Sequence, residues 1–210
     1  MNRTMLRTFA PSHLRTVLWT VLATTAFIAA PAFGQTASPL AITAATVSID
    51  GTSNVHDFTA STRTVTLAAA ALAGDPGEDV LAHALQPGSL TAFEVVIPAA
   101  TLKSEKGDID ENMHKALKVR QHADIRFRLG ALEPAADGYR ATGWLTVAGV
   151  EKPVTLDVQA VRAGAALTVT GSTDLLMTDY GISPPRMMLG VLKTNPKVTI
   201  RLELTLAEAR

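Results

Sequence analysis

The sequence predicts an all-β protein, folded as an extended antiparallel up-and-down barrel of eight strands with one short helix. Short segments alternate apolar and polar residues with the period of two that half-buried strands show. Gly, Pro and Asp interrupt these segments at short intervals, so consecutive strands are joined by tight turns and run antiparallel. A closed barrel has no free sheet edge, and eight strands leave an interior that side chains fill or one small ligand occupies.

The last predicted strand, residues 198–206, shows the alternation most clearly. Every second residue from Val198 to Leu206 is a branched aliphatic, and the residues between them are polar. Such a strand buries one face and exposes the other to water. The pair Asp137-Gly138, between two alternating segments, indicates a hairpin turn. The other segments with a strand pattern are residues 42–50, 55–70, 93–97, 125–129, 139–147, 154–158 and 167–171.

Residues 108–119 are predicted to form the helix. Acidic residues occupy its first turn and basic residues lie near its end, an arrangement that complements the helix dipole. Asp108 is expected to accept hydrogen bonds from the free amides of the first turn, as an N-cap residue does. The apolar residues at helical spacing are Ile109, Met113, Ala116 and Leu117. The pattern of residues 80–86 is ambiguous.

Charge and composition exclude several classes of function. The chain has 19 basic and 19 acidic residues, and three of the basic ones (Arg3, Arg7 and Arg15) lie in the first 34 residues, so the remainder carries 16 basic against 19 acidic residues. A mildly acidic domain without a basic run is a poor match for nucleic acid. Cysteine is absent, which excludes disulfides, thiolate nucleophiles and Cys-ligated metals. Hydrophobic residues make up 47%, enough to build a core.

Residues 1–34 have the pattern of a signal peptide. Arg residues precede an apolar stretch, residues 17–30, and small residues follow it. A membrane-spanning helix needs roughly 20 apolar residues, so this stretch is too short for a membrane anchor. Cleavage sites of the small-x-small type follow Ala32 and Gly34, so the mature chain is expected to begin at Phe33 or Gln35. The expected domains are therefore 1–34 as signal peptide and 38–208 as barrel.

Ser53, His56 and Asp57 lie close together in the sequence and are the residue types of a hydrolase catalytic triad. A triad needs three groups that converge from separate elements, whereas adjacent residues of an extended segment point to opposite faces. The chain also lacks a Gly-x-Ser-x-Gly nucleophile elbow. We interpret the cluster as a hydrogen-bonded turn after Asp50-Gly51, and we expect no catalytic residues.

Metal and cofactor motifs are weak in this chain. The histidines after the signal peptide are His56, His83, His114 and His122, and none of them has metal-ligand spacing. Met177, Met187 and Met188 would suit copper, but methionine more often fills irregular apolar gaps, so Met188 is expected to line a pocket. The acidic residues at 108–111 lack the glycine and glutamate of a calcium loop. We expect neither a metal nor a cofactor.

Three stretches of the sequence resemble the YceI-like family. The segment 149–156, Gly-Val-Glu-Lys-Pro-Val-Thr-Leu, is similar to its most specific signature. The segment 51–58, and residues 113–118 followed by 124–127, are similar to other family motifs, and residues 177–185 fit the same branch. The chain departs from the pattern at His122-Ala123, where an aromatic residue and proline are usual. The resemblance implies a lipocalin-like barrel, exported to the periplasm, that binds a long apolar molecule such as a polyisoprenoid or a fatty-acid amide.

The first functional hypothesis is thus an exported, non-enzymatic protein that holds a lipid-like molecule inside its barrel. Its mouth is expected to be built from residues 74–88, 98–112 and 180–193, with Tyr180, Arg186 and Lys193 as candidates to contact a head group. The residues expected to line the interior are Phe93, Val95, Ile97, Ile125, Phe127, Leu145 and Val147.

The alternative hypothesis is a filled barrel without a lipid cargo. Such a protein would act as a periplasmic scaffold, or as a stress-related partner of a membrane redox protein. After signal cleavage no stable membrane insertion is expected, and the sequence leaves a homodimer open.

Overall fold

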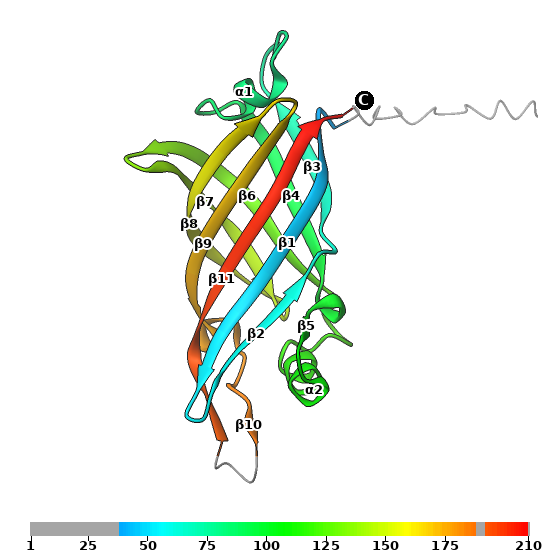
Figure 1. Cartoon of the computed structure of the whole chain (residues 1–210), viewed down its shortest axis with the longest axis vertical. Helices are drawn as coiled ribbons and strands as arrows, with labels where there is room; N and C mark the ends of the chain where they lie inside the picture. Colours follow the sequence, from blue (N-terminus) through cyan, green and yellow to red (C-terminus); the bar gives the residue numbers. More distant parts are fainter. Residues whose placement is uncertain (1–37, 188–191, 210) are drawn as a thin grey trace, which may run out of the picture. The chain divides into compact units, whose positions relative to one another are not determined.

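The computed structural model describes residues 38–187 and 192–209, so the predicted signal peptide lies outside the described residues. The described chain forms one antiparallel sheet of eleven strands that curls into a barrel (Figure 1). The predicted all-β antiparallel barrel is therefore confirmed, with more strands than the eight expected. No helix within these residues is long and apolar enough to cross a membrane.

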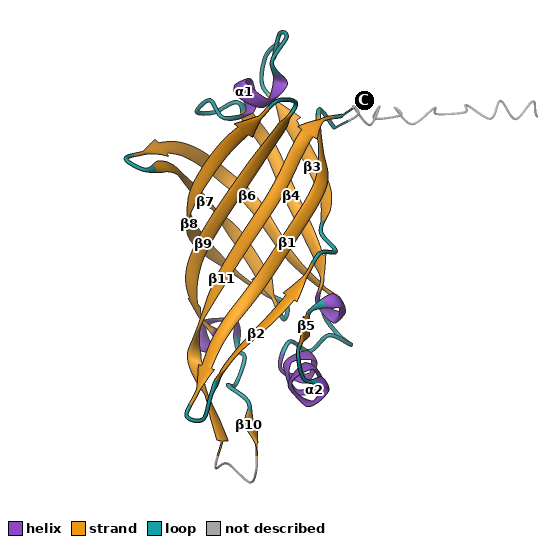
Figure 2. Cartoon of the chain, viewed as in Figure 1, coloured by secondary structure: helices purple, strands orange, loops and turns teal. Residues whose placement is uncertain are grey.

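Strands make up most of the described chain, and the few helices are short (Figure 2). The helical segments are η1 (Ala99–Thr101), η2 (Met177–Tyr180), α1 (Val80–Ala84) and α2 (Gly107–Ala116). The strands are β1 (Leu40–Ser53), β2 (Asp57–Thr62), β3 (Thr66–Leu72), β4 (Leu90–Pro98), β5 (Lys103–Ser104), β6 (Asp124–Ala135), β7 (Gly138–Val147), β8 (Val150–Ala163), β9 (Ala166–Leu176), β10 (Arg186–Met187) and β11 (Leu192–Glu208).

A bend in one predicted strand links the two sides of the curled sheet. The strand order is β3-β4-β6-β7-β8-β9-β11-β1-β2-β5. β2 pairs with β1 and β3 pairs with β4, and only residues 63–65 separate β2 from β3. The segment expected as a single strand over 55–70 therefore changes partner midway. The Thr62 hydroxyl accepts from the backbone N–H of Thr64 (3.0 Å), which stabilises the bend.

The predicted alternation of faces is confirmed along the long strands. In β8, Val154, Leu156 and Val158 are buried, and the residues between them are exposed. In β11, Leu204 and Leu206 are buried, whereas Arg201 lies outside and pairs with Asp50 of β1. The strands therefore present one apolar face to the interior and one polar face to water.

Apolar side chains gather at three levels inside the barrel. The α1-end cluster contains Leu40, Val80, Leu81, Ala84, Leu167 and Leu206. The central cluster contains Ala141, Val154, Leu156 and Val158. The α2-end cluster contains Val47, Ile97, Ala99, Leu102, Leu117, Ile125, Val147, Ala148, Tyr180 and Ile182, and Met113 and Ala116 of α2 pack against it. The two longer helices thus lie at opposite ends of the barrel (Figure 1).

α1 arises from the segment whose pattern was ambiguous. The Asp79 carboxylate caps it by accepting from the backbone N–H of Ala82 (2.9 Å), and it also pairs with Arg162 of β8. Both contacts hold the pKa of Asp79 below its ordinary value, the Arg162 hydrogen bond most strongly. The helix has five residues, too few for a helical period to be visible in the sequence.

α2 confirms the predicted helix with shifted ends. It begins at Gly107 and ends at Ala116, not at 108 and 119, because Lys118 adopts a left-handed conformation (φ 53°) and its carbonyl accepts from Gln121 and His122 in a turn. Asp108 is not the N-cap residue, which is Lys106. Its carboxylate instead accepts from the backbone N–H of Ile109 (3.0 Å), within the first turn.

Candidate ligand-binding cavity

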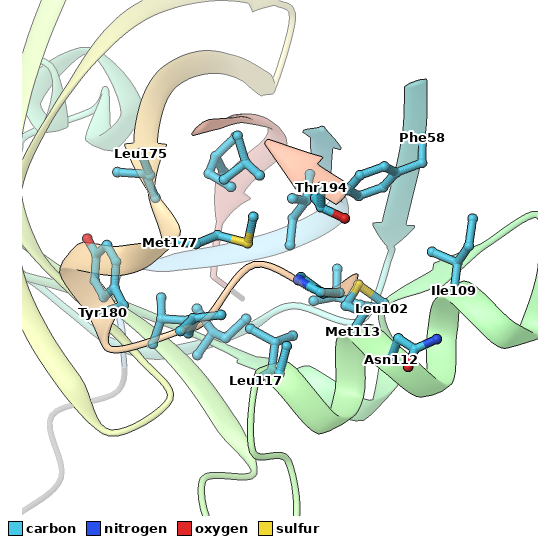
Figure 3. A pocket seen from close by; sticks show the side chains of 18 of the residues that line it. Phe58, Leu102, Ile109, Asn112, Met113, Leu117, Leu175, Met177, Tyr180 and Thr194 are labelled. Carbon is cyan, nitrogen blue, oxygen red and sulfur yellow. The ribbon is translucent and has the colours of Figure 1, made fainter. Parts of the chain in front are cut away.

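A cavity of about 460 Å³ opens at the α2 end of the barrel (Figure 3). Of the 25 described residues that line it, six have polar or charged side chains other than tyrosine. Ligand pockets of small molecules usually measure about 300–1,000 Å³ and combine apolar walls with a few polar groups. The cavity has the size and the chemistry of such a pocket.

Side chains from several strands and from one helix line the cavity. Inward-facing residues of seven strands supply Val47, Ile49, Phe58, Ile97, Ile125, Leu145, Val147, Leu175, Val198 and Ile200. The apolar face of α2 closes one side with Ile109, Met113 and Ala116, and Leu117, the C-cap residue, continues it. Figure 3 shows Ile109 and Met113 on this helix. The helical spacing of these four residues therefore serves to complete the wall of the cavity.

Phe58 reaches the wall because a glycine lies beneath its ring. Gly51 of β1 is directly opposite Phe58 of β2 in the sheet. A Cβ on residue 51 would lie 2.3 Å from Cζ of Phe58, a separation that atoms do not tolerate. Gly51 thus lets the ring lie flat across the neighbouring strand, which explains why the segment 51–58 begins with glycine and ends with phenylalanine.

A buried carboxylate fixes α2 against the barrel. Asp110, whose side chain is 11% exposed, accepts from the backbone N–H of Ser104 (2.6 Å) and from its hydroxyl (2.8 Å), and lies 3.5 Å from Nζ of Lys103. Burial alone would raise the pKa of Asp110, but the Ser104 donors and Lys103 together lower it below its ordinary value. On the same helix, His114 Nε2 lies 3.0 Å from the carbonyl oxygen of Leu102.

The polar lining residues form a rim at the open end. They are Ser53 at the end of β1, His56 just before β2, Lys106 at the N-cap of α2, Asp108 and Asn112 within α2, and Thr194 of β11. The Ser53 hydroxyl donates to the carbonyl of His56 (2.8 Å) and accepts from the backbone N–H of Val55 and of His56. The interpretation of this cluster as a turn is confirmed. The side chains of His56 and Lys106 are exposed at the rim.

Tyr180 lines the cavity from the wall rather than from the rim. It belongs to η2 and is 4% exposed. Burial, helped by the negative charge of Asp179, raises the pKa of its hydroxyl. The phenol therefore stays neutral across the physiological range, and its ring adds to the apolar surface.

A family model for the YceI-like domain matches residues 35–206 of the sequence. The chain belongs to the YceI-like domain family. No curated protein is similar enough to count as a match.

Solved structures share the fold of this YceI-like domain. BcnA of Burkholderia cenocepacia superposes with a TM-score of 0.59 at 16% identity, covering 77% of this chain and 95% of its own. A polyisoprenoid binding domain from Saccharophagus degradans gives 0.58 at 12% identity, with 82% and 99% covered. A YceI protein of Campylobacter jejuni gives 0.52 at 17% identity, with 70% and 85% covered. At these identities the likeness establishes the fold.

Five of the ten residues predicted for ligand contact line the cavity: Ile97, Ile125, Leu145, Val147 and Tyr180. Phe93, Val95 and Phe127 lie outside its lining. Phe93 packs against the α1-end cluster and Phe127 against the central cluster. Met188 lies outside the described residues, and of Arg186 the structure describes only the backbone pairing with Lys193.

The expectation that residues 74–88 border the mouth is wrong. α1, in the middle of this segment, packs against Leu40, Leu167 and Leu206 at the opposite end. The other two segments expected there, 98–112 and 180–193, do contribute lining residues. Sequence reasoning did not assign the apolar face of α2 or Phe58 to the cavity. The helical spacing of Ile109 and Met113 was visible, but nothing in it specified which surface the helix covers.

No group of three or more His, Cys, Asp or Glu side chains suited to a metal ion occurs among the described residues. The residues that line the cavity offer apolar contact along the wall, together with hydrogen bonding and charge at the rim.

Proposed function

We propose that this YceI-like domain is an exported binding protein that holds one lipid-like molecule, with its apolar chain in the cavity at the α2 end and its polar group at the rim. The observation that carries the proposal is the segregation of the lining, with apolar side chains along the wall and polar ones at the opening. An amphiphile has the same two-part character. The similar fold named as a polyisoprenoid binding domain supports this choice of ligand class.

The binding energy would come mainly from the chain. Each buried methylene contributes about 0.8 kcal/mol, so a chain of about ten methylenes gains about 8 kcal/mol before ordering costs are subtracted. Apolar contact is not directional, so the wall is expected to accept many kinds of chain. Selection of the polar group would fall to exposed rim residues such as His56 and Lys106.

Export is part of the proposal and rests on residues 1–34 of the sequence. The intact mass of the protein from fractionated cells should correspond to a chain that begins at Gln35 or Phe33. A membrane-bound form that retains residues 1–34 would contradict export as a free protein.

The test of cargo combines native mass spectrometry with solvent extraction. Protein purified without detergent should carry an extractable lipid, and delipidated protein should bind palmitic acid with a stoichiometry of one. Val147→Trp should abolish both signals, because the indole would occupy the space of the ligand while the fold persists.

Val154→Trp is the matched control. Val154 is as buried as Val147 but belongs to the central cluster and lies outside the cavity lining, so a tryptophan there overpacks the core and should destabilise the protein by about 1–3 kcal/mol. A parent protein that carries no lipid and binds no palmitate, with both variants equally destabilised, would favour the filled scaffold without cargo.

A further inference from the structure

The cavity ends partway along the barrel. On β4 and β6 its wall includes the opposed pair Ile97 and Ile125. The next inward-facing pair along these strands is Val95 and Phe127, and neither belongs to the lining. On β4 and β6 the boundary of the cavity therefore lies between these two pairs, whereas on β7 Leu145, the partner of Phe127, still lines it.

At this boundary the ring of Phe127 packs against the backbone of β7. A Cβ on Gly143 of β7 would lie 2.9 Å from Cε2 and 3.0 Å from Cζ of Phe127, so the ring edge rests on bare backbone. Leu145, the next inward-facing residue of β7, contacts both the α2-end and the central clusters. Phe127 packs against the central cluster and is paired across β6 and β7 with Leu145, which lines the cavity.

Beyond Phe127 the interior holds packed side chains of the central and α1-end clusters. An apolar chain that enters at the rim therefore runs toward the ring of Phe127 and the residues packed behind it. A cavity of about 150 Å³ accommodates one benzene molecule, so about 460 Å³ accommodates roughly 18 carbon atoms.

We propose that the cavity measures chain length, with Phe127 as the stop that limits a bound chain to roughly 15–20 carbon atoms. This inference rests on the proposed function and specifies its ligand class as amphiphiles of medium chain length. The carbons of a longer chain that exceed this limit would remain at the mouth in water and add no affinity.

The test uses saturated fatty acids of increasing chain length, which keep the head group constant, in displacement titrations of a fluorescent fatty-acid analogue from delipidated protein. Affinity should rise roughly tenfold for every two methylenes and then become constant within the proposed range. Phe127→Ala should move this break to chains several carbons longer. Phe127→Leu should move it less, in the same direction, and serves if the alanine variant does not fold.

Phe93→Ala is the matched control. Phe93 is also an inward-facing phenylalanine, but it packs against the α1-end cluster, so its loss should leave the break unchanged. Affinity that continues to rise past 22 carbons, or an equal shift in the Phe93 and Phe127 variants, would overturn the length limit while leaving the proposed function intact. Absence of binding for every chain length would overturn both.

Discussion

The two ends of this barrel are built from the same kind of strand but differ in what fills them. At the α1 end, a five-residue helix inserts Val80, Leu81 and Ala84 among side chains of β1, β9 and β11. At the α2 end, a longer amphipathic helix forms one side of the wall, and a cavity remains between it and the strands. Alternation along the strands creates one apolar face throughout, and the connecting segments decide whether that face meets other side chains or open space.

The comparison predicts its largest effect within a single strand. Leu167 and Leu175 both belong to β9, but Leu167 is 2% exposed in the α1-end cluster, whereas Leu175 lines the cavity. Leu167→Ala should cost about 2–5 kcal/mol, because it creates a new cavity in a packed region. Leu175→Ala should cost about 1–2 kcal/mol in delipidated protein, because the leucine already faces open space. Urea denaturation of both variants measures the difference, and equal losses would mean that the two ends are equally packed.

The turns at the two ends give the next contrast. Gly149, in the β7–β8 turn, and Gly164, in the β8–β9 turn, both have positive φ (81° and 61°), which costs alanine about 1–2 kcal/mol. At Gly149 a Cβ would also lie 2.3 Å from the His122 ring, whereas at Gly164 it would meet no atom within 4 Å. Gly149→Ala should therefore be more destabilising than Gly164→Ala, by about 1 kcal/mol.

A double variant isolates the cause of that difference. If the His122 ring is responsible, the change Gly149→Ala should cost no more than Gly164→Ala when it is made in a His122→Ala background. The double-mutant cycle consists of the parent, Gly149→Ala, His122→Ala and the double variant. Their thermal and urea midpoints give the coupling between the two positions. An unchanged cost in that background would assign the difference to the turn itself.

These contrasts also mark what the sequence could and could not predict. Period-two alternation assigned Phe127 and Ile125 correctly to the inward face, because it depends only on the strand pleat. Their position along the barrel axis, relative to the end that side chains fill, depends on strand register and on where residues 74–88 pack. Both are set by contacts between residues that are far apart in the sequence. The bend at residues 63–65 was missed for a similar reason, since β2 and β3 have continuous strand composition and differ only in their partners.

The carboxylates that hold the two helices should respond to pH. The pKa of Asp110 is lowered in the folded state, so its charge stabilises the fold above the unfolded pKa of about 3.9, and this contribution is lost as the pH falls below that value. At pH 7, Asp110→Asn should cost about 1 kcal/mol, and the difference from the parent should shrink below about pH 4. Asp79→Asn is the counterpart at the α1 end. Its carboxylate is half exposed, so we expect a smaller change over the same pH range.

The smallest effects are expected on the outer wall, where the two ends should not differ. Arg126 near the α2 end pairs with Asp124 and Glu94, and Arg162 at the α1 end pairs with Asp79; their side chains are 49% and 42% exposed. Water and salt screen such pairs, so each arginine-to-alanine change should cost at most about 1 kcal/mol. The two losses should agree within about 0.5 kcal/mol in urea melts and decrease together when salt is raised. A loss at one end that exceeds this range and persists in high salt would mean that the outer wall contributes to the difference between the ends. Equal losses would assign that difference to the interior, where the α1 end is filled and the α2 end is hollow.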